Sequence, residues 1–277
     1  MLAVCAPQYY NCTGTSSYTE SKKVIGIIYI LTGLISQLIY ILVLYTIFYS
    51  KPLFALPCYK IMFFLGIPDV LSLFFCADLA GLYSIFGIHP CYSIKFTFST
   101  GCLVFGLWHM SCMYVLLLAF NRVCELVSTK KCEFLFRKFY LKILLFLPVP
   151  YFLYFTFFTK PTFFNSSASV FFLNPMSEAT KTIPSEHYTV KAYVFNNFFV
   201  IISIGSSYLI ICTHLIIKSW KIKIVRTSIL VRRVTYQCLI VCACHFIGCF
   251  MAYLRMCISF SIHPFEVISE SCFSNFR

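Results

Sequence analysis

Charged residues are scarce in this 277-residue sequence, and acidic residues are the scarcest of them. Asp and Glu together number 9 against 22 Lys and Arg, and charged residues make up 11% of the chain. Hydrophobic residues make up 60%, whereas soluble domains contain roughly 45–50%. One core cannot bury that excess, which excludes an ordinary soluble enzyme and predicts that lipid surrounds much of the chain.

The sequence also lacks the residue groups on which enzymes and cofactor sites depend. Its acidic residues are isolated, and it contains neither a Ser, His and Asp group nor a glycine-rich phosphate loop. We therefore expect no enzymatic activity and no cofactor. Cys238, Cys242 and His245 share a helix face close to Cys244, but thiols and a lone imidazole on a membrane helix are more typical of packing than of metal binding.

The net charge of +13 does not indicate a nucleic-acid partner, because Lys and Arg separate apolar runs instead of forming a continuous polar patch. Most of the 16 cysteines fall inside the same runs. A free thiol there behaves as a small hydrophobe, so a disulfide scaffold is not expected.

Six apolar runs approach the length of roughly 20 residues that spans a bilayer. Backbone groups in lipid must be bonded within their own segment, so each run is predicted to be a helix. The expected fold class is all-α, a polytopic membrane helix bundle. The predicted spans are residues 24–49, 61–86, 96–120, 143–159, 192–217 and 234–254, which together form a 24–254 transmembrane domain.

Lys and Arg concentrate in alternate loops, which predicts the orientation of the chain. The first, third and fifth loops contain 14 of the 22 basic residues, so residues 1–23 are expected to be extracellular. Two sequons, at Asn11 and Asn165, lie on that same predicted side and are candidate glycosylation sites. Residues 255–277 contain Pro264, Glu266 and Glu270, so no charge-free seventh span can be drawn there. We expect a truncated C-terminal tail.

The second predicted span contains two carboxylates, which are costly in a membrane. Asp69 is expected near the midplane as a polar packing or switch position, with a neutral structural Asp as the alternative. Asp78 follows nine residues later and is expected on the opposite helix face. Arg122 stands where the third span leaves the bilayer, and by itself it is typical of a snorkelling interfacial anchor.

Four groups of residues together carry a family resemblance. They are Tyr10-Asn11-Cys12, the run 58–69 that ends at Asp69, Gly101-Cys102 with Gly106-Leu107-Trp108, and Leu118-Ala119-Phe120-Asn121-Arg122. In these the chain resembles the nematode serpentine receptor class T (Srt) family of seven-transmembrane, G-protein-coupled chemoreceptors. The resemblance implies a chemosensory receptor that binds a small-molecule odorant and engages a heterotrimeric G protein. It also implies switch roles for Asp69, Asn121 and Arg122.

The chain departs from the rhodopsin-like receptor plan at two places. The loop 160–191 has no cysteine for the usual bridge to the third helix, and the seventh span is missing from the predicted set. Because Cys12 lies in the family-like Tyr-Asn-Cys motif, we predict a disulfide between Cys12 and Cys91.

Candidate ligand-binding residues come from the outer halves of three predicted spans. They are Phe98, Cys102 and Phe105 of the third, Asn196 and Asn197 of the fifth, and His245 and Tyr253 of the sixth. One of the two asparagines is expected to hydrogen-bond a ligand, or equally both join helices to each other. Such a lining suits small, mostly uncharged molecules.

Two other functions stay open. A truncated, non-signalling isoform would act only as a partner of full-length receptors and would be retained in the endoplasmic reticulum rather than reach the plasma membrane of sensory cells. A small-solute transporter would require internal repeats or matching interrupted helices, and the sequence shows neither.

Overall fold

The computed structural model describes residues 20–88, 90–127, 134–165, 169–173, 190–221, 236–237 and 239–251. The chain divides into two compact units. The first comprises Met1–Asn121 and Thr129–Val190, and the second Arg122–Ser128 and Lys191–Arg277. The second unit therefore begins within a helix of the first.

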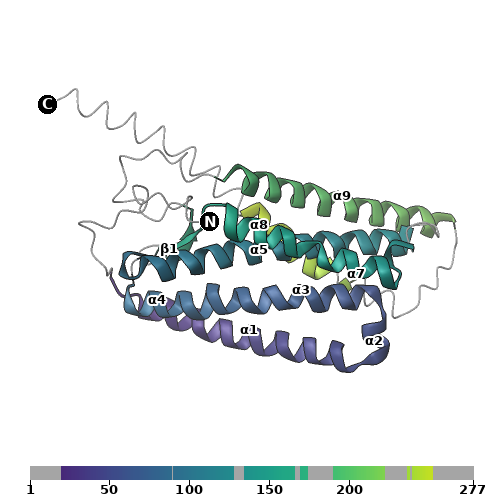
Figure 1. Cartoon of the computed structure of the whole chain (residues 1–277). Coiled ribbons are helices and arrows are strands. Elements are labelled where there is room, and N and C mark those ends of the chain that lie inside the picture. Colours follow the sequence, from purple (N-terminus) through teal and green to yellow (C-terminus); the bar gives the residue numbers. More distant parts are fainter. Residues whose placement is uncertain are drawn as a thin grey trace. The chain divides into compact units, whose positions relative to one another are not determined.

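Helices make up nearly all of the described part of the first unit (Figure 1). Its elements, in chain order, are α1 (Lys23–Tyr49), α2 (Lys51–Ala55), α3 (Pro57–Leu73), the π-helix η3 (Phe74–Leu79), α4 (Ala80–Phe86), the short 3₁₀ helix η4 (Pro90–Tyr92), α5 (Ile94–Val127), the 3₁₀ helix η5 (Phe134–Phe136), α7 (Lys138–Phe146), α8 (Pro148–Phe158), and the strands β1 (Phe163–Asn165) and β2 (Val170–Phe172).

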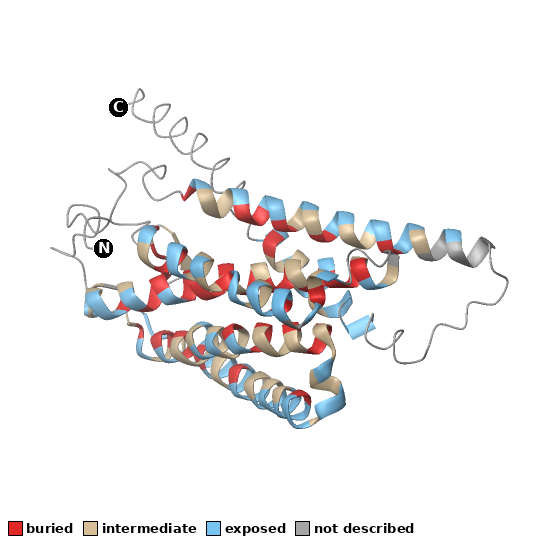
Figure 2. Ribbon diagram, turned by 45° about the vertical axis from the view of Figure 1, so that its right-hand side comes forward, coloured by how far each residue is buried: buried red, intermediate tan, exposed pale blue. Residues whose placement is uncertain are grey.

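Five helices in the described part of the chain are long and apolar enough to cross a membrane: Lys23–Tyr49, Pro57–Phe86, Ile94–Leu126, Phe139–Phe158 and Lys191–His214. They confirm the first five predicted spans and the all-α membrane class. Of the five, α1 is the least buried and α5 the most, and exposed side chains recur along α1 (Figure 2). An apolar surface of that extent is what a lipid solvent requires.

Glycines bring α1 against α4, which it runs alongside (Figure 1). A Cβ built on Gly26 would lie 2.5 Å from the Gly81 carbonyl oxygen, and one built on Gly81 would lie 2.7 Å from the Gly26 oxygen. No side chain fits at either position. Because helices in lipid gain little from apolar contact alone, this close backbone approach strengthens the van der Waals packing between them.

The second predicted span is one helical run built from α3, η3 and α4, with two irregularities. Pro68 lies inside α3 and is buried, and its ring removes one hydrogen bond of the helix ladder. Six residues later the run widens into the π-helix Phe74–Leu79. A π segment turns less per residue than an α-helix, so it changes which side chains face a neighbouring helix.

A two-stranded antiparallel hairpin follows α8 in the chain and belongs to the first unit. Phe163 pairs with Phe172 and Asn165 with Val170. Phe164 is buried in a cluster with Ala80 and Tyr83. The hairpin therefore adds Phe164 to the hydrophobic packing of α4.

The second unit contains α9 (Lys191–Lys221) and a shorter apolar helix, Leu239–Met251, which covers part of the sixth predicted span. The ring of Phe246 is the nearest group to a Cβ built on Gly205, at 3.9 Å, so α9 has open space at that glycine. Residues 252–277, where the prediction of a missing seventh span falls, lie outside the described residues.

Candidate functional site

Asp69 lies at the junction of three helices of the first unit. Ser111 of α5 donates a hydrogen bond from Oγ to Asp69 Oδ1 over 2.7 Å, and Tyr40 of α1 donates from Oη to Asp69 Oδ2 over 3.1 Å. Both carboxylate oxygens thus have a donor, each from a different helix. An intramembrane carboxylate held this way joins α1, α3 and α5.

Asp78 is bonded from α1 as well. Gln37 donates from Nε2 to Asp78 Oδ2, and Asp78 Oδ1 faces Gly33, where a built Cβ would lie only 2.5 Å from it. The prediction that Asp78 lies on the face opposite Asp69 is therefore wrong. Asp78 itself lies in the π-helix, which turns less per residue than a regular α-helix, so both carboxylates bond to the same helix.

A second contact region joins α5 to α8 through aromatic rings. His109 stacks on Phe155 with ring centroids 3.4 Å apart, and Tyr151 and Phe105 meet these rings edge-on. A Cβ built on Gly106 would collide with the Thr156 hydroxyl and would lie 2.9 Å from the Phe152 ring. Phe105 is 2% exposed, so this candidate ligand residue lies within helix packing.

Phe98 and Cys102 lie nearer the start of α5 than Phe105 does. Phe98 is half-buried, and its ring centroid lies 6.1 Å from that of Phe163 in β1. Cys102 is buried and is not part of a disulfide. Of the three candidates on α5, Phe98 is therefore the one next to the hairpin.

The candidates on α9 and the following helix belong to the second unit. Asn196 donates from Nδ2 to Asn197 Oδ1 over 3.3 Å, and both side chains are buried. His245 is half-buried, and its Nδ1 lies 3.1 Å from the Val241 carbonyl oxygen of its own helix. The structure thus joins the two asparagines to each other. A pocket shared with the α5 residues stays a prediction.

Arg122 is buried, at 1% exposure, and its Nη2 forms an ion pair with Glu125 Oε2 one helical turn later. Asn121, the residue before it, is 4% exposed. A snorkelling anchor would extend its guanidinium outward, so the anchor interpretation does not describe Arg122. The arginine is instead held within the helix end.

Four predicted positions concern covalent chemistry on the outer side. Cys91 is disulfide-bonded, but Cys12 lies outside the described residues, so that pairing stays a prediction. Asn165 is half-buried at the end of β1, whereas Asn11 is not described.

Tyr253, the last candidate ligand residue, also lies outside the described residues. No group of three or more potential metal ligands occurs in the part of the chain that the structure describes.

Comparison with known families agrees with these features. The model of the family described as serpentine type 7TM GPCR chemoreceptor Srt matches residues 2–274. The chain belongs to this family. As an Srt member it is a multi-pass membrane protein of the G-protein-coupled chemoreceptor type, and the matched region includes the tail to Ser274. No curated protein is a significant match to the chain.

Sequence reasoning missed the donors of this Srt receptor's carboxylates and the partner of its arginine. Gln37 and Tyr40 are three residues apart in a charge-free span, and that spacing is the signal of one polar face. Glu125 stands three residues after Arg122, the spacing of an ion pair on one helix. Ser111 gave no such signal, because a single hydroxyl in a helix usually bonds its own backbone.

Proposed function

We propose that this chain is a chemosensory receptor that binds small, mostly uncharged molecules and passes the signal to a heterotrimeric G protein through the end of α5. One observation carries the proposal: near the end of α5 in this member of a chemoreceptor family, the buried Arg122 pairs with Glu125. Asn121 replaces the acidic residue that rhodopsin-like receptors keep before this arginine. Glu125 supplies the carboxylate instead.

The burial of Arg122 within this pair supports a switch role for it. The side chain of Arg122 is 2% exposed and that of Glu125 is 45% exposed. Removing the partner of a buried charge is costly, so the guanidinium stays paired until another acceptor replaces Glu125. Ligand binding shifts the receptor toward the state in which Arg122 is released, because the ligand binds that state more tightly.

The experiment compares Arg122→Ala with the native chain in membranes that contain a heterotrimeric G protein and an odorant panel. We expect Arg122→Ala to abolish ligand-dependent nucleotide exchange at an unchanged surface level. Arg137→Ala is the matched control, because Arg137 is an exposed arginine on the same predicted side and its loss should leave exchange intact. Equal loss of exchange and surface level in Arg122→Ala would identify the residue as a structural anchor.

For the ligand we propose contacts from the seven residues Phe98, Cys102, Phe105, Asn196, Asn197, His245 and Tyr253. None of them is Asp, Glu, Lys or Arg, which favours small uncharged ligands over peptides. Phe98 supports this best, since its ring is half-buried beside the hairpin. Phe98→Ala should raise the concentration of odorant needed for half-maximal exchange, whereas Phe105→Ala should lower stability as well.

A variant of the pair Asn196 and Asn197 can distinguish a role in ligand binding from a role in helix packing. Replacement of Asn197 by Leu removes the acceptor of the amide pair. If the amide meets the ligand, the variant loses odorant sensitivity but keeps its thermal unfolding midpoint. A fall in the midpoint without any change in odorant sensitivity would show that the amides only join helices.

The second candidate function is a non-signalling isoform that acts as a partner of full-length receptors. The sequence feature that favours it is the tail after Leu254, which is polar beyond Ile262. We propose an extracellular N-terminus pinned by a Cys12–Cys91 disulfide, and six spans would then leave a C-terminal tag lumenal. Tag staining after selective permeabilisation tests the topology. A lumenal tag with retention in the endoplasmic reticulum supports the isoform, and efficient plasma-membrane display supports the receptor.

A further inference from the structure

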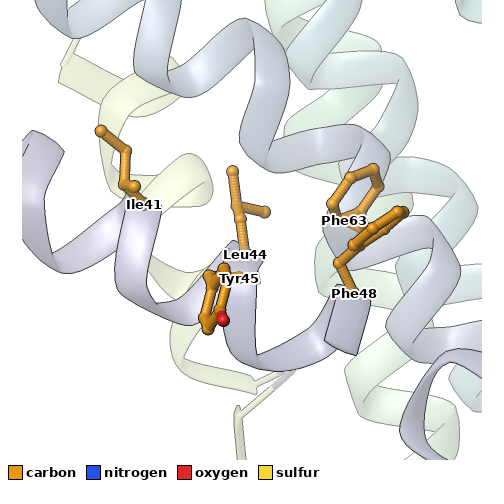
Figure 3. A pocket seen from close by; sticks show the side chains of 5 residues that line it. All are labelled: Ile41, Leu44, Tyr45, Phe48 and Phe63. Atoms are coloured by element: carbon orange, nitrogen blue, oxygen red, sulfur yellow. The ribbon is translucent and has the colours of Figure 1, made fainter. Parts of the chain in front are cut away.

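A hollow lies on the flank of α1 and α3, and none of the candidate ligand residues lines it. Figure 3 shows its lining, which is Ile41, Leu44, Tyr45 and Phe48 of α1 and Phe63 of α3. Its volume is about 340 Å³, and it is open along one side. The Tyr45 hydroxyl is the one polar group among the five side chains.

The shape of this groove is fixed by close packing beneath it. A Cβ built on Gly66 of α3 would lie 2.5 Å from Leu44 Cδ2, so the absence of a side chain at Gly66 gives Leu44 its place. The rings of Phe48 and Phe63 stack at one end, with centroids 5.7 Å apart. Tyr45 and Phe48 are each 60% exposed. On a membrane-spanning helix, the medium that meets this open side is lipid.

A positive charge lies at the aromatic end of the groove. Phe54 of α2 packs edge-on against Phe48 and Phe63, and the Nζ of Lys60 lies 5.8 Å from the centroid of the Phe54 ring. The ammonium is thus one ring away from the groove wall. Lys51 begins α2 at the same end of the helices. Among the residues that the structure describes, no carboxylate forms an ion pair with either lysine.

We propose that this groove binds one acyl chain of an anionic phospholipid whose phosphate pairs with Lys60. A groove open along one side suits a chain whose other side contacts bulk lipid, whereas small-molecule pockets bury most of their ligand. The loop between α1 and α3 is predicted to face the cytoplasm, and that leaflet carries the anionic lipids. Charge complementarity selects the headgroup, because neither a sterol nor a zwitterionic phospholipid supplies a net negative charge to Lys60 and Lys51.

The test uses the purified full-length chain in phosphatidylcholine nanodiscs with a trace of photoreactive lipid. Phosphatidylserine carrying a diazirine on its acyl chain should label the peptides that contain the groove residues, and more strongly than the matching phosphatidylcholine probe. Replacing Lys60 with Gln should lower this labelling about fivefold, the effect of one basic residue at the membrane surface. High salt should also lower the labelling of the native chain, because it screens the attraction between Lys60 and the phosphate.

Matched variants separate a built site from general lipid contact. Lys60→Arg should restore the labelling, and Lys95→Gln, which removes an exposed lysine at the start of α5, should leave it unchanged. Ile41→Trp should fill the groove and reduce labelling, whereas Ile39→Trp, on a part of α1 that does not line it, should not. Size-exclusion profiles identify variants that fail to fold, and the salt titration does not depend on any variant.

Three outcomes would overturn the proposal. The first is equal labelling of the groove by the phosphatidylcholine and phosphatidylserine probes. The second is displacement of both probes by a photoreactive sterol. The third is labelling of Lys60→Gln at the same level as that of Lys95→Gln.

Discussion

In the first unit, hydrogen bonds to carboxylates join α1 to α3, whereas aromatic rings packed around a glycine join α5 to α8. We call the first the carboxylate seam, made of Asp69, Asp78 and their donors Gln37, Tyr40 and Ser111. We call the second the aromatic seam, made of Phe105, His109, Tyr151 and Phe155 around Gly106.

The two seams differ in how easily they can rearrange. Interhelical hydrogen bonds in membranes contribute only about 0.6 kcal/mol each on average, because the separated helices find other partners. A donor can therefore exchange acceptors at small cost. Where a neighbouring side chain fills the space beside a glycine, the two helices have no other arrangement that packs as densely. We therefore expect the carboxylate seam to rearrange more easily than the aromatic seam.

The largest effect is expected at the aromatic seam, from Gly106→Ala. The new methyl group would meet the Thr156 hydroxyl and the Phe152 ring, so α5 and α8 must separate. Overpacking of this kind costs about 1–3 kcal/mol, which exceeds the ~1 kcal/mol that alanine adds to helix propensity. We expect a lower thermal unfolding midpoint in detergent.

Gly205→Ala is the matched control for Gly106→Ala. Its Cβ would have only the Phe246 ring within reach, at 3.9 Å, so the same substitution should leave the midpoint unchanged or raise it. If the two glycine variants behave alike, close approach at Gly106 is not what holds α5 to α8.

An intermediate effect is expected at the carboxylate seam, from a double-mutant cycle of Asp69→Asn and Ser111→Ala. Each single variant weakens the bond between Ser111 Oγ and Asp69 Oδ1. We expect a coupling energy of about 1 kcal/mol, near the upper part of the range for interhelical bonds in membranes. Unfolding free energies of the four proteins in one detergent give the value, and a coupling of zero would remove Asp69 from the junction.

The smallest effect is expected from Tyr40→Phe, which deletes the 3.1 Å bond to Asp69 and keeps the ring. The predicted loss is about 0.6 kcal/mol. The variant is informative because, if the carboxylate seam rearranges during activation, loss of this bond should change the rate of nucleotide exchange on the G protein more than the free energy of unfolding. A stability loss as large as that of Gly106→Ala would make the two seams equivalent and contradict the comparison.

The spans and the membrane class could be predicted because they depend on composition and length alone. Asp69 could be singled out as a polar packing or switch position because a carboxylate in an apolar run requires a partner. Its donors could not be named, since hydroxyl and amide side chains occur in several spans and the sequence does not say which helices touch. Asp78 was misplaced because regular α-helical rotation was assumed across residues that form the π-helix Phe74–Leu79.

Arg122 shows the limit from the other direction. Its position at the end of a span predicted an exposed anchor, and the family motif predicted a switch, but neither indicates burial. The guanidinium is buried and paired with Glu125. Burial depends on which helices surround the end of α5, and no local pattern contains that information.

The most direct test of the account is ligand-independent nucleotide exchange on a heterotrimeric G protein by the Glu125→Gln variant. If the pair with Glu125 restrains Arg122, losing about 1 kcal/mol of ion pairing should raise basal exchange about fivefold over the native chain. Adding Arg122→Ala to that variant should return exchange to the background of empty membranes. Basal exchange that stays at the native level in Glu125→Gln, with surface expression intact, would contradict the account.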